Sequence, residues 1–143
     1  MTFWREQNLM RETTFKCVLL ADGHHGLSEG LRGLLETTFD SVVMVANETS
    51  LLTTATRLRP EAAVVDLSLA QQSDLRWLRS LRQSCPELTL IVLSVHDEAS
   101  VHQAALEAGA DGFVLKRAIA TDLLPAIDAA LQRRHESPPT KVP

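Results

Sequence analysis

Four polar residues each follow an apolar run, and together they could bind an anion and react with it. Asp22 follows "CVLLA", Asp66 follows "AAVV", Ser94 follows "LIVL" and Lys116 follows "GFVL". A carboxylate can act as a nucleophile, while an ammonium and a hydroxyl can stabilise the negative charge of an incoming group. Each of these residues alone is more often a turn residue, a cap or a solvated strand end. Their shared position after apolar runs makes them one candidate site.

Elements of two kinds alternate along the chain and would position these residues. Segments with leucine and alanine at helical spacing separate the apolar runs, which are too short for helices. The alternation predicts an α/β fold, a single doubly wound five-stranded parallel sheet with helices on both faces. Ligands bind such sheets outside the carboxyl ends of the strands, where the four polar residues should meet. The predicted strands are residues 17–21, 41–46, 62–67, 88–94 and 112–116.

Short polar and acidic residues indicate where three of the helices begin. Pro60 predicts the end of the second helix, and Pro125 is expected in the first turn of the last helix, where its missing N–H does least harm. The predicted starts are Thr49 with Ser50, Asp97 with Glu98, and Thr121 with Asp122.

Composition limits the class of protein. The chain has 143 residues, 45% hydrophobic and 22% charged, which is typical of one globular domain. A net charge of -4 gives no basic footprint for nucleic acid. Cys17 and Cys85 stand in no metal-binding or redox spacing, so both are expected as reduced thiols.

The two ends of the chain differ from the part between them. Residues 1–15 are expected as an N-terminal extension, 16–134 as the domain and 135–143 as a Pro-rich tail or linker. The first residues are charged and lack the apolar core of a signal peptide. No apolar run approaches the length of a membrane span, so we expect a cytoplasmic protein that does not engage a membrane.

Four stretches occur in an order that is specific to one family: "VLLADGHHGLSEGLRGLL", "AAVVDLSL", "LIVLSVHDE" and "AGADGFVLK". Over about residues 16–134 the sequence resembles the receiver domains of bacterial two-component response regulators. The sequences of these stretches are most similar to those of the NarL/LuxR-type transcription regulators, in which a helix-turn-helix module follows the receiver. The resemblance implies a flavodoxin-like receiver fold.

The resemblance also implies roles for individual residues. Asp66 would be the phospho-acceptor, which takes a phosphoryl group from a kinase phosphohistidine. Lys116 would pair with the phosphoryl oxygens, and Ser94 would hydrogen-bond them. Phe113 matches the aromatic switch residue that turns inward when the domain is phosphorylated, although it could equally be a plain core aromatic.

The same resemblance implies a Mg2+ site, but this sequence lacks one of the acidic ligands of that site. The ligands would be Asp22, Asp66 and the backbone carbonyl of Ser68. The family has two adjacent acids after the first strand, but here Gly23 stands at the second position, that of the direct metal ligand. Because Mg2+ is held through one or two carboxylates, its binding should be weakened. His24 and His25 do not replace the acid, since imidazole suits Zn2+ or Cu2+ better.

Three further residues depart from the family pattern. Ala70 stands where proline is usual and Asp74 where glycine is usual, so the geometry of the loop after the third strand is in question. Arg117 follows Lys116 in place of a frequent proline. None of these changes touches a chemical residue.

Three hypotheses of function remain. The first is a phosphorylated receiver that has a sensor histidine kinase as partner, homodimerises, and contacts DNA only through a downstream helix-turn-helix domain absent from this chain. The second, motivated by Gly23, is a pseudo-receiver that acts in dimerisation or docking without phosphorylation. The third is an enzyme, which we do not expect. Haloacid-dehalogenase-type phosphatases need a second aspartate where Ser68 stands, and flavodoxins need a hydroxyl-rich loop after the first strand.

Overall fold

The computed structural model describes residues 17–22, 25–69 and 75–136, and the side chains of 25–28, 135 and 136 are left aside. Five strands and five α-helices alternate along this part of the chain, with two short 3-10 turns after β3 and β5. The elements are β1 (Cys17–Ala21), α2 (His25–Leu35), β2 (Ser41–Val45), α3 (Glu48–Leu58), β3 (Ala62–Asp66), η2 (Leu67–Leu69), α4 (Arg76–Ser84), β4 (Thr89–Ser94), α5 (Ala99–Glu107), β5 (Gly112–Leu115), η3 (Lys116–Ala118) and α6 (Ile119–Glu136).

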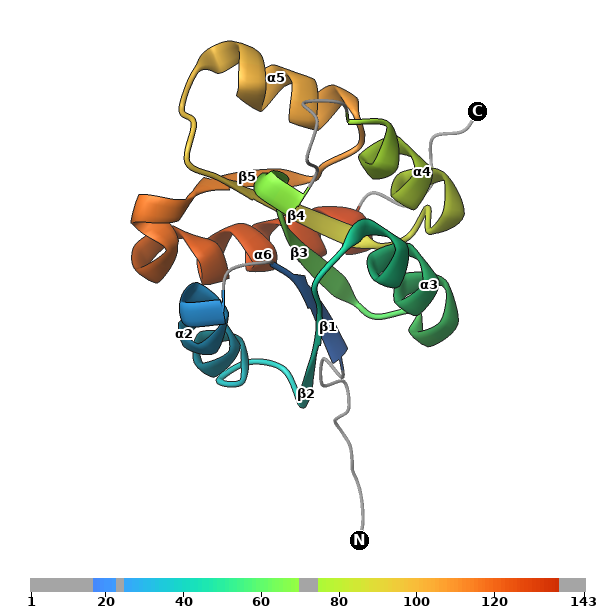
Figure 1. The fold of residues 1–143 in the computed structure, drawn as a ribbon, viewed down its shortest axis with the longest axis vertical. Coiled ribbons are helices and arrows are strands. Elements are labelled where there is room, and N and C mark those ends of the chain that lie inside the picture. Colours follow the sequence, from blue (N-terminus) through green and yellow to red (C-terminus); the bar gives the residue numbers. More distant parts are fainter. Residues whose placement is uncertain (1–16, 23–24, 70–74, 137–143) are drawn as a thin grey trace, which may run out of the picture.

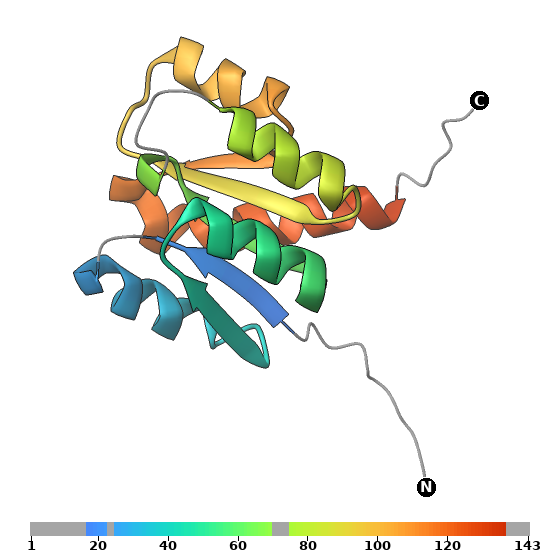
Figure 2. The ribbon, with the colours of Figure 1, turned by 45° about the vertical axis from the view of Figure 1, so that its right-hand side comes forward.

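The strands form one parallel sheet in the order β2-β1-β3-β4-β5. Helices α2 and α6 cover one face of the sheet, and α3, α4 and α5 cover the other (Figures 1 and 2). This is the doubly wound arrangement that the alternation of apolar runs predicts, so the fold class is confirmed. All five predicted strands are present, with ends within one residue of the expected positions.

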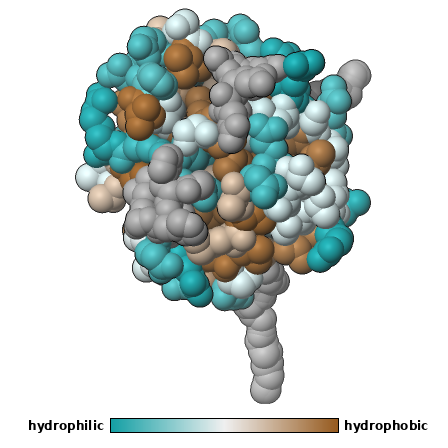
Figure 3. Space-filling model, in the orientation of Figure 1, coloured by the Kyte–Doolittle hydropathy of each residue, from teal (hydrophilic) through white to brown (hydrophobic). Residues whose placement is uncertain are grey.

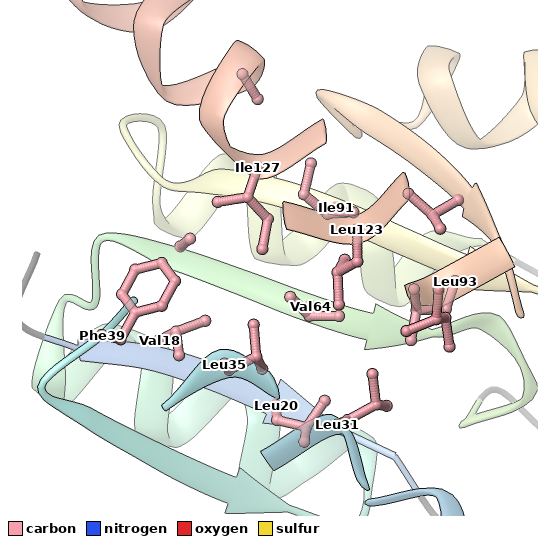
Figure 4. Packing of buried hydrophobic residues seen from close by; sticks show 14 of the residues in the cluster. Val18, Leu20, Leu31, Leu35, Phe39, Val64, Ile91, Leu93, Leu123 and Ile127 are labelled. Atoms are coloured by element: carbon pink, nitrogen blue, oxygen red, sulfur yellow. The ribbon is translucent and has the colours of Figure 1, made fainter. Parts of the chain in front are cut away.

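The core consists of two layers, because alternate residues of each strand point to opposite faces. In β3, Ala62 and Val64 pack beneath α2 and α6, whereas Ala63 and Val65 pack beneath α3, α4 and α5. Figure 4 shows the first layer, in which side chains of α2 and α6 meet those of the central strands. Burial on both faces explains why the central strands are nearly continuous apolar runs.

The residues that signalled the starts of α3 and α6 lie in the first turns of these helices, but the predicted place of Pro125 is wrong. Helix α3 begins at Glu48 because Asn47 is its N-cap, and the Asn47 side chain accepts a hydrogen bond of 2.8 Å from the Ser50 amide. Helix α6 begins at Ile119, because the 3-10 turn of η3 leads directly into it. Pro125 therefore lies in the second turn of α6, inside the helix, and not in the first turn.

The end of α3 agrees with the prediction from Pro60. Arg59 caps the helix in the left-handed conformation, with φ 50° and ψ 62°, and its amide donates to the Ala55 carbonyl. A residue before proline is disfavoured in the helical conformation, so the chain leaves the helix there.

A partly buried ionic cluster joins α4, β4, α6 and the residue before β5, at the edge of the sheet opposite to the strand ends that carry the candidate site. Asp111 accepts hydrogen bonds from Arg82 (2.8 Å), from Arg134 (2.9 Å) and from the Leu90 amide (2.8 Å). Arg82 also donates to the carbonyl of Gly109. Burial lowers the pKa of Arg82, while the facing Asp111 carboxylate raises it. The cluster fixes the start of β5 against α4 and α6.

The surface is mixed in polarity. Large hydrophobic side chains that are exposed among the described residues are Met44, Leu58, Val95 and Leu106. In Figure 3 apolar atoms lie between hydrophilic ones, with their largest gathering at the lower part of this face. None of the helices in the described part of the chain is long and apolar enough to cross a membrane.

Candidate anion-binding site at the strand ends

Asp66 ends the central strand β3, and its side chain is only 1% exposed. Lys116 Nζ lies 2.5 Å from Asp66 Oδ2, and the Ser68 amide donates to Oδ1 at 2.9 Å. Burial would raise the pKa of Asp66, but the hydrogen bonds from Lys116 and Ser68 and the Lys116 charge outweigh it. The net effect lowers this pKa below its ordinary value of 3.8. Asp66 is therefore an ionised carboxylate at neutral pH.

Lys116 is placed by the end of the edge strand. β5 ends at Leu115, so Lys116 is the first residue of η3, and its side chain is 13% exposed. The stem is thus largely covered while the ammonium reaches across β4 to Asp66. The resulting pair holds one negative and one positive charge in a poorly solvated place, which strengthens their attraction.

Ser94 ends β4, between Asp66 and Lys116 in the sheet. Asp66 pairs with Leu93, and Ser94 pairs with Leu115, so Ser94 lies one residue further along the same edge. Its side chain is buried, and its oxygen accepts a 2.9 Å hydrogen bond from the His96 amide. Since a hydroxyl both accepts and donates, its hydrogen remains available for an anion.

Asp22 lies beside Asp66 at the other side of the site. Ala21 pairs with Val65, so Asp22 and Asp66 are the next residues on neighbouring strands. Asp22 is 6% exposed, and its amide donates to the Val45 carbonyl at 3.2 Å. The sheet therefore brings the two predicted carboxylates to one edge.

The oxygen donors at this site suit a hard cation, but they are few. Asp22, Asp66 and the Ser68 carbonyl are oxygen donors, the kind that Mg2+ takes together with water. Within the described residues, no group of three His, Cys, Asp or Glu side chains is arranged to hold a metal. These residues therefore offer the type of donor that Mg2+ prefers, but they include fewer carboxylates than the family has at this site. Gly23, His24, Ala70 and Asp74 lie outside the described residues, as does the side chain of His25.

Phe113 lies on the edge strand β5, half-buried, and packs against the layer beneath α5. The ring of His102 on α5 stacks on it, with ring centroids 4.5 Å apart and an interplanar angle of 13°. Reasoning from sequence did not single out His102. It lies in a segment with alanines at helical spacing, and that pattern gave no sign of a ring contact.

A second interaction that the sequence did not reveal joins the loops around the site. Arg117 Nη2 donates to Asp97 Oδ2 at 3.1 Å. Asp97 and Glu98 were expected at the start of a helix, and Glu98 is the N-cap of α5, which begins at Ala99. Neither side chain makes a capping bond there, and that of Asp97 is paired with Arg117 instead. The pair links the loop after Ser94 to the residue after Lys116.

Comparison with known proteins identifies the class of protein that has this fold and these residues at the strand ends. The sequence model of the response regulator receiver domain matches residues 18–128, so the chain belongs to that family. The nitrate/nitrite response regulator protein NarP of Escherichia coli (strain K12) is 34% identical over 122 residues, 84% of this chain and 57% of NarP. The chain thus spans little more than half the length of the curated relatives that it matches.

Solved structures agree with this assignment. A LuxR-family two-component response regulator from Aurantimonas sp. SI85-9A1 has a TM-score of 0.76 and 27% identity, with 84% of this chain and 86% of that chain covered. A Burkholderia pseudomallei response regulator, solved with a phosphorylated aspartic acid, a calcium ion and citrate, has a TM-score of 0.70 and 25% identity over 89% of this chain and 75% of that one. The similarities to NarP and to the LuxR-family structure place the chain in the NarL/LuxR-type branch.

Proposed function

We propose that this chain is a phospho-accepting receiver in which a histidine kinase phosphorylates Asp66. The observation that carries the proposal is the contact of an ionised, buried Asp66 with Lys116 beside the Ser94 hydroxyl. The phosphorylated aspartic acid in the Burkholderia relative supports the same chemistry.

The proposed reaction is a phosphoryl transfer. A carboxylate oxygen of Asp66 forms a bond to phosphorus while the P–N bond of the kinase phosphohistidine breaks, and the electron pair returns to the imidazole. Lys116 and the Ser94 hydroxyl stabilise the phosphoryl oxygens as Asp66 loses its own negative charge. Asp22, Asp66 and the Ser68 carbonyl would hold Mg2+, which supplies neutralising charge at the phosphoryl group when bound.

The direct test is labelling with a small phosphodonor. The chain incubated with acetyl phosphate and Mg2+ should gain the mass of one phosphoryl group, in a bond that hydroxylamine cleaves. Asp66→Asn should abolish this gain, while Asp128→Asn, a change of an exposed aspartate on α6, should leave it intact. Labelling that survives Asp66→Asn would overturn the proposal.

Gly23 favours a second candidate, a pseudo-receiver that docks or dimerises without phosphorylation. Mg2+ titration separates the two functions, because a phospho-accepting site should bind Mg2+ saturably at millimolar concentration, and a pseudo-receiver should not. Gly23→Asp should tighten the binding in either case, because it restores a carboxylate. A chain that neither binds Mg2+ nor accepts phosphate until Gly23→Asp is introduced supports the pseudo-receiver.

The partners follow from this proposal and from the length of the relatives. The sensor histidine kinase is the phosphodonor, and the phosphorylated domain would form a homodimer. DNA binding would belong to a helix-turn-helix domain beyond the receiver, since the chain spans little more than half of its curated relatives. The domain would work in the cytoplasm, as a regulatory module and not as an enzyme.

A further inference from the structure

The loop after β4 is held at two points on either side of the candidate site. At its start, the His96 amide donates to Ser94 Oγ at 2.9 Å. At its far end, Asp97 pairs with Arg117, which follows Lys116 in η3, at 3.1 Å. These two contacts connect the element that carries Ser94 to the element that carries Lys116.

Both contacts favour an orientation of the Ser94 hydroxyl in which its hydrogen points to an anion. The His96 amide occupies an acceptor lone pair of Ser94 Oγ, so the hydroxyl hydrogen is left to donate toward an anion. Keeping His96 in place requires that the loop does not swing outward, and residues 95–98 are all exposed, with Val95 at 64%. Packing therefore does little to hold this loop, and the ion pair to Arg117 is the contact that ties it to the neighbouring strand end.

We propose that Asp97 and Arg117 are positioning residues, which hold the Ser94 hydroxyl ready for the phosphoryl group on Asp66. The inference rests on the proposed function and adds two residues to its site. Arg117 stands where the family often has proline, so this tether is built from residues of this chain and not from the family pattern.

Two other roles for the pair make different predictions. Arg117 could instead bind the phosphoryl group directly, with Asp97 as a competitor; removal of Asp97 would then speed phosphorylation and removal of Arg117 would slow it. The pair could also keep the loop away from the site, and both removals would then speed phosphorylation. A positioning pair requires that both removals slow it, and by similar factors, because either one breaks the same contact.

The test uses the full chain with Asp97→Ala, Arg117→Ala and the double variant, and measures initial rates of labelling by acetyl phosphate with Mg2+. Exposed pairs shift equilibria by factors of about 1.5 to 5, so each single variant should be slower by a factor in this range. The double variant should be no slower than either single variant. The charge-exchanged variant Asp97→Arg with Arg117→Asp should recover most of the rate.

The matched control is the exposed pair of Arg32, on α2, and Glu36, directly after α2, which has the same 3.1 Å separation. Arg32→Ala and Glu36→Ala should leave the rate unchanged. A second measurement does not depend on phosphorylation: hydrogen exchange of the His96 amide should become faster by about 1.5 to 5 times in Asp97→Ala and Arg117→Ala, and not in the control variants.

The outcomes separate this inference from the proposed function. If the unmodified chain is labelled at Asp66 but the single variants are not slower, or have opposite effects, the positioning role is wrong and the phospho-acceptor role stands. If the unmodified chain is not labelled, the proposed function fails, and the exchange of His96 still decides whether the pair holds the loop. Unchanged exchange of His96 in both single variants overturns the inference in either case.

Discussion

Lys116 Nζ lies 2.5 Å from Asp66 Oδ2, although the two residues come from different strand ends on either side of β4. The buried carboxylate is thus ionised and already paired before any phosphoryl group arrives. An incoming anion would have to share the ammonium with Asp66, and the ammonium passes to the phosphoryl oxygens as the carboxylate charge is consumed.

The first prediction concerns the pKa of Asp66. Lys116→Met removes both the hydrogen bond and the charge, so the effect of burial should prevail and the pKa of Asp66 should rise above 3.8. Carboxyl carbon chemical shifts followed against pH measure this value directly. Lys116→Arg keeps the charge and should keep the pKa low.

The same substitution should change how stability depends on pH. In the unmodified chain the pKa of Asp66 is lower folded than unfolded, so its contribution is complete above about 3.8 and is lost as pH falls through the folded pKa. In Lys116→Met the sign reverses, and the carboxylate opposes folding above its raised pKa. A pKa that remains below 3.8 in this variant would show that Ser68 and other contacts suffice.

The second prediction concerns the ionic cluster at the opposite edge of the sheet. Asp111→Ala leaves the guanidinium groups of Arg82 and Arg134 and the Leu90 amide without their shared acceptor. Because these groups are largely covered, the free energy of unfolding should fall by about 3 kcal/mol. Urea denaturation measures the loss.

Glu36→Ala provides the comparison, since its pair with Arg32 is half-exposed and should contribute less than about 1 kcal/mol. Equal losses for the two variants would contradict a structural role of the cluster. Labelling of Asp66 should be unchanged in Asp111→Ala at temperatures where this variant remains folded.

The third prediction concerns Gly109, which has a φ of +118°. A Cβ at this position would lie 2.9 Å from Arg82 Cβ and Cγ, so Gly109→Ala combines backbone strain with a clash against the cluster. The free energy of unfolding should fall by about 1 to 3 kcal/mol.

Gly33→Ala on α2 is the opposite case. Apart from the backbone of α2 itself, no atom lies within 4 Å of the added Cβ, and the backbone is helical, so this substitution should raise the free energy of unfolding by up to about 1 kcal/mol. The two alanine variants should therefore shift the urea midpoint in opposite directions, and shifts of the same sign would refute the reasoning.

The strands were predictable because each buried run is bounded by polar or turn residues, and its length is that of a strand. The register follows from the same pattern, since a slip of one residue would exchange the two layers of the core. The edge of the sheet that holds Asp66, Ser94 and Lys116 followed from the rule that parallel strands end together. That rule requires no knowledge of side-chain contacts.

Contacts between residues far apart in sequence were not predictable in the same way. Asp111 and Arg82 are 29 residues apart, and nothing in either neighbourhood indicates the other. Asp97 illustrates the ambiguity of a single acid before a helix, because its side chain is used by Arg117 and not by the helix amides. Asn47 was missed as a cap because Thr49 and Ser50, close behind it, are also good capping residues.

The last prediction concerns the ring pair of His102 and Phe113. Stacked aromatic pairs contribute about 0.5 to 1.5 kcal/mol beyond their buried area, so His102 should hold Phe113 in its present, half-exposed position. If Phe113 turns inward on phosphorylation, as the resemblance to receiver domains implies, the stack opposes this step. His102→Ala should then increase the inward population of the ring in the unphosphorylated chain by about 2- to 10-fold, as measured by side-chain NMR couplings of Phe113. His102→Phe keeps a stacking ring and should leave the population close to that of the unmodified chain. If the rotamer of Phe113 is unchanged in His102→Ala, its position is set by packing against the core beneath α5, and the switch role loses its support.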